Sequence, residues 1–288
     1  MRMSEFRNAR SAARFRTAYD HALAVLLPGP RTAIEVSTAH GTTRVHRAGP
    51  AAGRPIVLLP GSGGNGLMWH HQLDELAARH PVFAIDPIGE PGASVQRAPI
   101  ADGADAARWL EDVLTELDLT DAHLVGCSYG GWVALQHRLH HPGRVGALTL
   151  LDPAGFNGFG FRFYAWLIAG GLAASAPRAL RPRLARAVGN SAVLEDELMR
   201  LTRAAMGFRR ALPVPPVLDD EELRRIDLPA LFLLGARSAL HDSAEVAARI
   251  ARVLPATARV ELVPGAGHSL PMDAPALVTE RILARTAA

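Results

Sequence analysis

Short apolar runs recur along the chain and alternate with longer segments in which the apolar residues have helical spacing. The apolar runs span residues 56–59, 82–85, 122–125, 145–151 and 231–234, and a more mixed strand-like segment spans 258–263. Such runs are typical of strands that are buried on both faces of a parallel sheet. Helical patterns lie near 68–78, 105–117, 130–140 and 243–254, and another begins near Pro275. The alternation predicts an α/β fold with a mostly parallel central sheet and helices on both faces.

Two segments depart from this alternation. Residues 4–27 carry aromatic and Leu residues at near-helical spacing and end at Pro28-Gly29, which predicts an amphipathic N-terminal helix within 1–30, followed by strand-like segments at 32–37 and 42–46. Residues 154–219 are first rich in Phe and Gly and then helical and rich in Arg. We therefore expect an α/β core formed by residues 31–153 and 220–288, and a helical cap formed by residues 154–219.

The basic residues argue against two classes of function. All 31 of them are Arg, and they are interspersed with 28 acidic residues, so that the net charge is only +3. A nucleic-acid-binding protein would be expected to gather its basic residues on one surface. The absence of Lys excludes Schiff-base chemistry on a lysine side chain.

The single cysteine and the apolar segments bear on the location of the protein. With Cys127 alone, an internal disulfide is excluded and a reducing compartment is favoured. The N-terminus lacks the pattern of a signal peptide, and the apolar run at 163–177 is too short to span a bilayer. We expect a cytoplasmic protein without a membrane span, and a homodimer is compatible with the sequence.

The candidate nucleophile lies in the pentapeptide Gly126-Cys127-Ser128-Tyr129-Gly130, between a predicted strand and a predicted helix. A sharp strand-to-helix turn exposes the hydroxyl of its serine, and flanking glycines allow the strand and helix to approach closely. Free N–H groups at the start of the helix can bind an oxyanion. The pattern predicts Ser128 as the nucleophile, whereas Cys127 is better interpreted as a small apolar residue that fills the end of the strand.

A second glycine-rich loop, Pro60-Gly61-Ser62-Gly63-Gly64, follows the first buried strand of the core. It lacks the Lys and the spacing of a phosphate-binding loop, and it lacks the Gly-x-Gly-x-x-Gly of a dinucleotide site. The alternative interpretation is an oxyanion loop, in which the backbone N–H of Ser62 acts together with that of Tyr129.

Further polar residues follow other predicted strands, namely Asp86, Asp152, Arg237 and His268. The carboxyl ends of parallel strands meet at one edge of a sheet, so we expect these side chains to lie near Ser128. His268 follows the last strand on a loop that contains Gly265 and Gly267, and it is the candidate base. His137, His140 and His141 have helical spacing, but no carboxylate accompanies them in the sequence, and we predict no metal site there.

On these motifs the chain resembles the α/β-hydrolase superfamily, in particular its small, capped, esterase-like bacterial members. The motifs that carry the resemblance span nearly the whole chain: Leu59 to Gly64, Gly126 to Gly130, Leu151-Asp152-Pro153, Leu234 to Ser238, and Pro264 to His268. The resemblance implies Ser128 as nucleophile, His268 as base, and the N–H groups of Ser62 and Tyr129 as the oxyanion hole. The order of nucleophile, acid and base along the chain also agrees with the family.

The acid of the implied triad is less clear from the sequence. Where the family usually has this acid, the chain has Ser238, and the oxyanion loop begins Pro60-Gly61 in place of the usual His-Gly. Asp242 and Asp152 are two alternatives. Asp242 begins a pattern that also fits a helix capping box, and Asp152 also fits a turn before Pro153. Asp152 is slightly favoured because a side chain that caps a helix cannot also orient His268.

The resemblance implies a serine hydrolase that cleaves a carboxylic ester or a related small acyl compound through an acyl-enzyme, without a metal or an organic cofactor. The aromatic start of the cap predicts that Phe163 and Trp166 line a hydrophobic acyl pocket. Two alternatives stay open because a fold does not determine a chemistry. One is a non-hydrolytic enzyme, such as an acyltransferase, lyase, perhydrolase or cofactor-free oxygenase. The other is a catalytically silent ligand receptor, which Ser238 in the acid position would allow.

Overall fold

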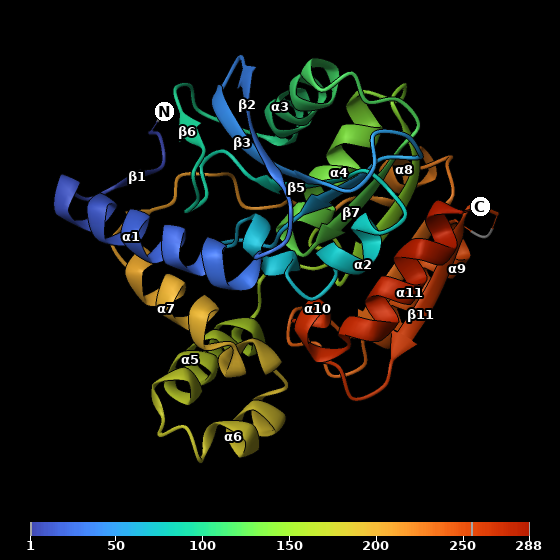
Figure 1. Ribbon diagram of the computed structural model, residues 1–288. Helices are drawn as coiled ribbons and strands as arrows, with labels where there is room; N and C mark the ends of the chain where they lie inside the picture. Colours follow the sequence, from blue (N-terminus) through green and yellow to red (C-terminus); the bar gives the residue numbers. More distant parts are fainter. Residues whose placement is uncertain (1, 255, 288) are drawn as a thin grey trace.

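The central element of the structure is a mixed sheet that is parallel over most of its width (Figure 1). The computed structural model describes residues 2–254 and 256–287. Within them the sheet has nine strands: β2 (Thr32–Thr38), β3 (Gly41–Ala48), β4 (Ile56–Leu59), β5 (Val82–Asp86), β6 (Val95–Gln96), β7 (Ala122–Cys127), β8 (Val145–Leu151), β10 (Ala230–Gly235) and β11 (Ala258–Val263). Their order is β11-β10-β8-β7-β4-β5-β3-β2, and β6 pairs with β3. Along this order, every neighbouring pair of strands from β11 across the sheet to β5 is parallel. Strand β3 runs antiparallel to its neighbours β5, β2 and β6.

Alternating side chains of each central strand enter two separate apolar clusters. In β4, Val57 and Leu59 pack into one cluster, and Ile56 and Leu58 pack into the other. The first cluster is covered by α3 (Gly103–Glu116), α4 (Tyr129–His140), α8 (Asp220–Arg224) and α9 (Ser243–Val253). The second is covered by α1 (Ala9–Leu26), α2 (Leu73–Ala77), α10 (Leu270–Asp273) and α11 (Pro275–Thr286). Burial on both faces explains why the central strands are apolar at most positions, and the predicted α/β class is confirmed.

The N-terminal segment and the segment after β4 differ from the predicted helices. The first helix begins at Ala9, because the side chain of Asn8 caps it by accepting a bond of 2.8 Å from the N–H of Ser11. The residues before it form β1 (Glu5–Phe6), which pairs with β9 (Phe208–Arg209). The predicted helix near 68–78 is a 3₁₀ turn, η1 (Gly66–Trp69), followed by the short α2. Strand β1 could not be predicted locally because its partner lies far along the chain.

Residues 154–219, which we call the insertion, leave the main sheet and return to it. They contain α5 (Phe161–Ser175), α6 (Arg181–Val188), η2 (Ser191–Leu194), α7 (Asp196–Ala205) and β9. Helix α7 packs against α1, and α5 and α6 lie farther from the sheet, at the bottom of Figure 1. Helix α5 leaves the large side chains of Phe161, Ile168 and Leu172 exposed.

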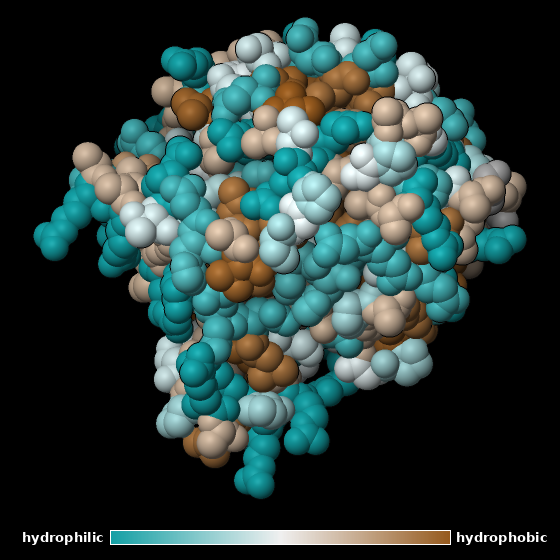
Figure 2. All heavy atoms as spheres, viewed as in Figure 1, coloured by the Kyte–Doolittle hydropathy of each residue, from teal (hydrophilic) through white to brown (hydrophobic). Residues whose placement is uncertain are grey.

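Apolar residues on the surface lie in separate groups among hydrophilic ones on the face that Figure 2 shows. None of the helices in the described part of the chain combines the length and hydropathy that crossing a bilayer requires.

Candidate active site

Ser128 lies on a sharp turn between β7 and α4. Its backbone has φ 51° and ψ −113°, a left-handed conformation that is rare for a residue with a side chain. A Cβ at Gly126 would lie 2.5 Å from the carbonyl oxygen of Gly130, and one at Gly130 would lie 2.4 Å from that of Leu59. Both positions therefore require glycine, as the pentapeptide predicts, because the helix packs directly onto the strands beneath it.

A chain of hydrogen bonds joins Ser128, His268 and Asp152, which come from the ends of three different strands. His268 Nε2 is 2.9 Å from Ser128 Oγ, and His268 Nδ1 is 2.5 Å from Asp152 Oδ2. An ionised carboxylate only accepts, so Nδ1 of His268 carries the proton. Nε2 of the neutral ring is then free to accept the proton of the Ser128 hydroxyl. The arrangement suits activation of a serine nucleophile by a general base.

Asp152 is fully buried and is held by donors on both carboxylate oxygens. Besides His268, it accepts from the backbone N–H of Gly235 at 3.2 Å and from the hydroxyl of Ser238 at 2.5 Å. Burial alone would raise the pKa of Asp152, but the hydrogen bond from His268, the neighbouring His241 and the Ser238 hydroxyl together hold it below its usual value. Ser238, which stands where the family usually has its acid, thus binds the carboxylate that contacts the base.

Asp242 lies elsewhere. Its side chain is exposed and caps α9 by accepting from the N–H groups of Ala244 at 3.0 Å and Glu245 at 3.2 Å. No hydrogen bond or ion pair connects it to His268 within residues 2–254 and 256–287.

The loop after β4 approaches Ser128 from the other side. A Cβ at Gly61 would lie 3.4 Å from Cβ of Ser128. The N–H of Gly64 bonds to the carbonyl of Gly61 and that of Gly63 bonds to Glu90, whereas the N–H of Ser62 bonds to no other described residue. Tyr129 is the first residue of α4, so its N–H has no acceptor within that helix. The two predicted oxyanion donors therefore have free N–H groups near the nucleophile.

An ion pair between buried Glu90 and partly buried Arg210 contacts both the glycine-rich loop and the ring of Tyr129. Neither residue was among those predicted from the sequence. Glu90 accepts from the N–H of Gly63 at 2.9 Å and from Arg210 Nε at 2.7 Å. The guanidinium of Arg210 lies 4.4 Å from the centre of the Tyr129 ring. Burial raises the pKa of Glu90, and Arg210 and the Gly63 N–H oppose this effect. Glu90 lies in a Gly- and Pro-rich loop after a predicted strand, which is a signal that could have identified it. No local sequence pattern identifies Arg210.

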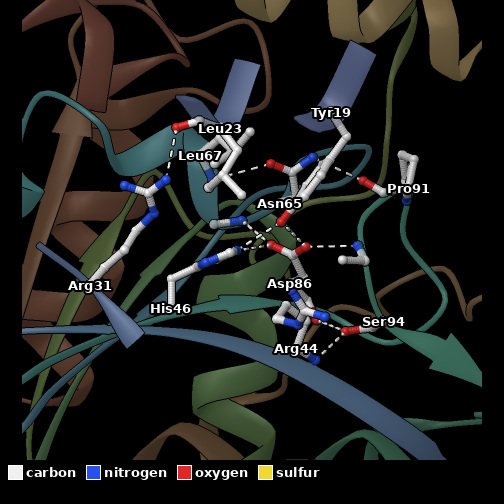
Figure 3. A network of polar contacts seen from close by, with 12 residues as sticks. Tyr19, Leu23, Arg31, Arg44, His46, Asn65, Leu67, Asp86, Pro91 and Ser94 are labelled. Carbon is white, nitrogen blue, oxygen red and sulfur yellow. Dashed lines mark hydrogen bonds and ion pairs between the residues drawn. The ribbon is translucent and has the colours of Figure 1, made fainter. Parts of the chain in front are cut away.

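Asp86, at the end of β5, is the centre of a network of polar contacts beside the start of η1 (Figure 3). Its carboxylate accepts from the N–H of Gly66 at 2.8 Å, from the N–H of Ala93 at 2.8 Å and from the hydroxyl of Tyr19 at 2.7 Å. His46 Nε2 lies 2.7 Å from the same hydroxyl oxygen. Burial and the charge of Asp86 raise the pKa of Tyr19 far above its usual value, so it stays a donor. One carboxylate thus connects α1, the start of η1 and the loop after β5.

A cavity of about 770 Å³ opens over Ser128 and His268. The insertion supplies one wall, including Phe163 and Trp166, whose ring centres lie 5.7 Å and 5.4 Å from that of His268 in edge-on contact. They are the two residues predicted from the sequence to line an acyl pocket.

Two other residues at strand ends do not join the hydrogen-bonded chain of Ser128, His268 and Asp152. Arg237 reaches the carbonyl groups of Arg186 and Ala187 in α6. Cys127 packs in the second apolar cluster, where burial raises the pKa of its thiol well above the usual range and disfavours a thiolate nucleophile.

Comparison with known proteins extends these observations to the whole chain. Residues 56–281 match the sequence profile of a family described as the alpha/beta hydrolase family. Carboxylesterase YbfK of Bacillus subtilis is 30% identical over 290 residues, which cover 97% of this chain and 95% of that protein. An uncharacterized carboxylesterase, nap, of the same organism is 30% identical over 279 residues, covering 94% of this chain and 91% of its own.

Solved structures agree with the sequence matches. The crystal structure of carboxylesterase CesB (YbfK) from Bacillus subtilis superposes with a TM-score of 0.79 at 27% identity, covering 96% of this chain and 98% of that one. Naproxen esterase from Bacillus subtilis gives a TM-score of 0.82 at 27% identity with the same coverage.

Proposed function

Because the chain belongs to the alpha/beta hydrolase family, we propose that it is a carboxylic ester hydrolase whose acyl-enzyme forms on Ser128. The observation that carries the assignment of residues is the unbroken chain of hydrogen bonds from Asp152 through His268 to Ser128 at the floor of an apolar cavity. The similar proteins YbfK and naproxen esterase are esterases by name, which supports the class of reaction.

The acylation step uses three side chains. Ser128 Oγ attacks the ester carbonyl carbon while His268 Nε2 takes the hydroxyl proton. Asp152 keeps the Nδ1–H tautomer of His268 and stabilises the imidazolium that forms. His268 then gives the proton to the departing alkoxide, and the alcohol leaves. An attacking water, deprotonated by the same nitrogen, releases the carboxylic acid and restores Ser128.

The backbone supplies the oxyanion hole in this proposal. The N–H groups of Ser62 and Tyr129 point to the oxygen that becomes negative in the tetrahedral intermediate. Fixed donors of this kind contribute about 2.7–4 kcal/mol each to catalysis in a serine hydrolase. The bonds that Asp86 and Glu90 make to Gly66 and Gly63 hold the loop in place for this purpose.

Ser238 gave reason to consider a silent receptor, because a chain without a triad acid would bind a substrate without cleaving it. The hydroxyl of Ser238 instead donates to Asp152, which supports a complete triad. The insertion acts as the cap in this proposal. A cytoplasmic location, predicted from the lone Cys127, and a homodimer stay predictions.

The proposed function is tested by active-site labelling. We expect a fluorophosphonate probe to modify the protein once, at Ser128, as located by peptide mass spectrometry. In H₂¹⁸O the enzyme should place one labelled oxygen in the product acid, since water attacks the acyl-enzyme. Labelling at Ser128 without incorporation from water would favour an acyltransferase or another non-hydrolytic enzyme. A lack of labelling would favour the receptor.

The acyl pocket gives a second prediction. Phe163→Ala or Trp166→Ala removes a ring beside His268, and the vacated space should shift the preference toward longer or bulkier acyl groups. The expected change in relative kcat/KM is about 10-fold or more for one class of acyl chain, measured across a series of p-nitrophenyl esters. The exposed Phe161 on the same helix provides the control, and Phe161→Ala should keep the profile. A fall in melting temperature with an unchanged profile would make Phe163 and Trp166 packing residues only.

A further inference from the structure

Two histidines of the core and one glutamate of the insertion meet beside the cavity, and the proposed mechanism uses none of them. His70 and His71 follow η1, and Glu195 lies between η2 and α7. His70 Nε2 is 3.3 Å from Glu195 Oε2, and His71 Nε2 is 2.8 Å from Glu195 Oε1. One nitrogen or oxygen from each residue lies within 4.8 Å of those of the other two.

The hydrogen bond at Nδ1 of His70 determines whether its Nε2 can accept. His70 Nδ1 is 3.1 Å from the carbonyl oxygen of Leu67, which can only accept, so Nδ1 carries the proton. In the neutral ring, Nε2 then presents a lone pair toward the carboxylate of Glu195, and two acceptors face each other. A second proton on the ring or a metal ion between the two groups satisfies both. Histidines that ligate metals usually donate their second ring N–H to a carbonyl or carboxylate in this way.

The spacing of the three donors suits a transition metal. Zn²⁺ binds imidazole nitrogen and carboxylate oxygen at about 2.0–2.2 Å, so tetrahedral ligand atoms lie about 3.4 Å apart. The distances of 3.3 Å from His70 Nε2 to Glu195 Oε2 and of 2.8 Å from His71 Nε2 to Glu195 Oε1 are close to this value, and all three ligand atoms lie within 4.8 Å of one another. A site made of two imidazoles and one carboxylate binds Zn²⁺ in preference to Mg²⁺ or Ca²⁺, which take oxygen ligands.

The surroundings leave Glu195 available as a ligand. It stands at the N-terminus of α7, yet its side chain makes no capping bond and turns toward the histidines. The adjacent carboxylates have other partners: Asp196 binds Arg178 and Arg181, and Glu197 contacts His21 and Arg200. The side chain of His70 is 8% exposed and that of His71 is 36% exposed, so an ion can enter from solvent on one side.

We propose that His70, His71 and Glu195 bind a divalent transition-metal ion such as Zn²⁺, and that the ion ties the insertion to the core. Met68 of the core and Ala192 of the insertion, close in sequence to these ligands, both line the cavity. The bound ion therefore fixes the distance between two walls of the active site. It acts on the stability and closure of the insertion and takes no part in the ester chemistry.

The test is metal binding to the whole protein after treatment with a chelator. Isothermal titration with Zn²⁺ should show one site per chain in the micromolar range, and the melting temperature should rise with Zn²⁺ concentration, since a ligand that binds only the folded state stabilises it. Co²⁺ in the same site should give the visible absorption of a low-symmetry, four- or five-coordinate complex. His71→Ala and Glu195→Gln should each weaken Zn²⁺ binding by at least about tenfold.

His21→Ala is the matched control. His21 also contacts a glutamate of α7, with 3.3 Å between His21 Nε2 and Glu197 Oε2, but no second histidine accompanies it in the described residues. This variant should bind Zn²⁺ as the wild type does. Circular dichroism in chelator shows whether each variant is folded. Equal Zn²⁺ affinity in the wild type, His71→Ala and Glu195→Gln, or no saturable binding in the micromolar range, would overturn the proposal and leave a hydrogen-bonded contact only.

Discussion

Replacement of Ser128 by alanine is expected to lower kcat for ester hydrolysis by about 10⁴-fold or more. The variant keeps the N–H groups of Ser62 and Tyr129 and the whole cavity, but it has no atom that can form the acyl-enzyme. A loss of this size corresponds to about 5.5 kcal/mol of transition-state stabilisation. Because the hydroxyl contributes little to ground-state binding, the affinity for a substrate analogue should stay close to that of the wild type.

The measurement pairs steady-state kinetics with thermal melting. Cys127→Ala is the matched control, because it changes the neighbouring residue on the same turn. That thiol is buried in apolar surroundings, so the control should keep most of the activity and lose a modest amount of stability. If Ser128→Ala retained full activity, or if Cys127→Ala lost as much as expected for Ser128→Ala, the nucleophile would be misassigned.

Asp152→Asn is expected to have the second-largest effect, a loss of about 10⁴-fold in kcat. An asparagine can offer its amide N–H to His268 Nδ1, which would then accept and leave the proton on Nε2. That tautomer cannot take the proton of Ser128, and the imidazolium of the transition state also loses its negative partner. Asp242→Asn should instead keep the activity and cost at most about 1 kcal/mol of stability, since asparagine is also a good helix cap.

The comparison needs both variants in the same assay, with urea unfolding to separate lost rate from lost stability. Ser238→Ala adds a third point. It removes one donor to Asp152 without removing the carboxylate, so its loss of rate should be far smaller than that of Asp152→Asn. If Asp152→Asn and Asp242→Asn both kept more than about a tenth of the wild-type rate, a barrier change below about 1.4 kcal/mol, neither would be the acid and Ser128 and His268 would act as a dyad.

Residues with a strong local pattern could be placed from the sequence. Ser128 is flanked by glycines at which an added Cβ would collide with neighbouring backbone, and His268 follows a strand at the same edge of the sheet. The choice between Asp152 and Asp242 could not be made with the same clarity. A capping pattern is local and visible, whereas the contact between Asp152 and His268 joins residues from distant strand ends.

The contacts that surround the candidate site could not be predicted from local sequence patterns. Arg210 reaches Glu90 from the irregular end of the insertion, and Tyr19 reaches Asp86 from the N-terminal helix. Each pair depends on how distant elements pack, which hydrophobic periodicity does not encode. The pairing of β1 with β9 also could not be predicted, because two residues are too few to show a strand pattern.

The pairing of β1 with β9 bears on how the enzyme should be attached to a support. Glu5 and Phe6 pair with the insertion, α1 packs against α7, and Tyr19 reaches the buried carboxylate of Asp86. A support attached ahead of β1 would therefore lie close to these contacts. The end of α11 lies on the opposite side of the molecule from β1 (Figure 1). A linker attached after α11 should therefore preserve turnover better than a linker attached ahead of β1.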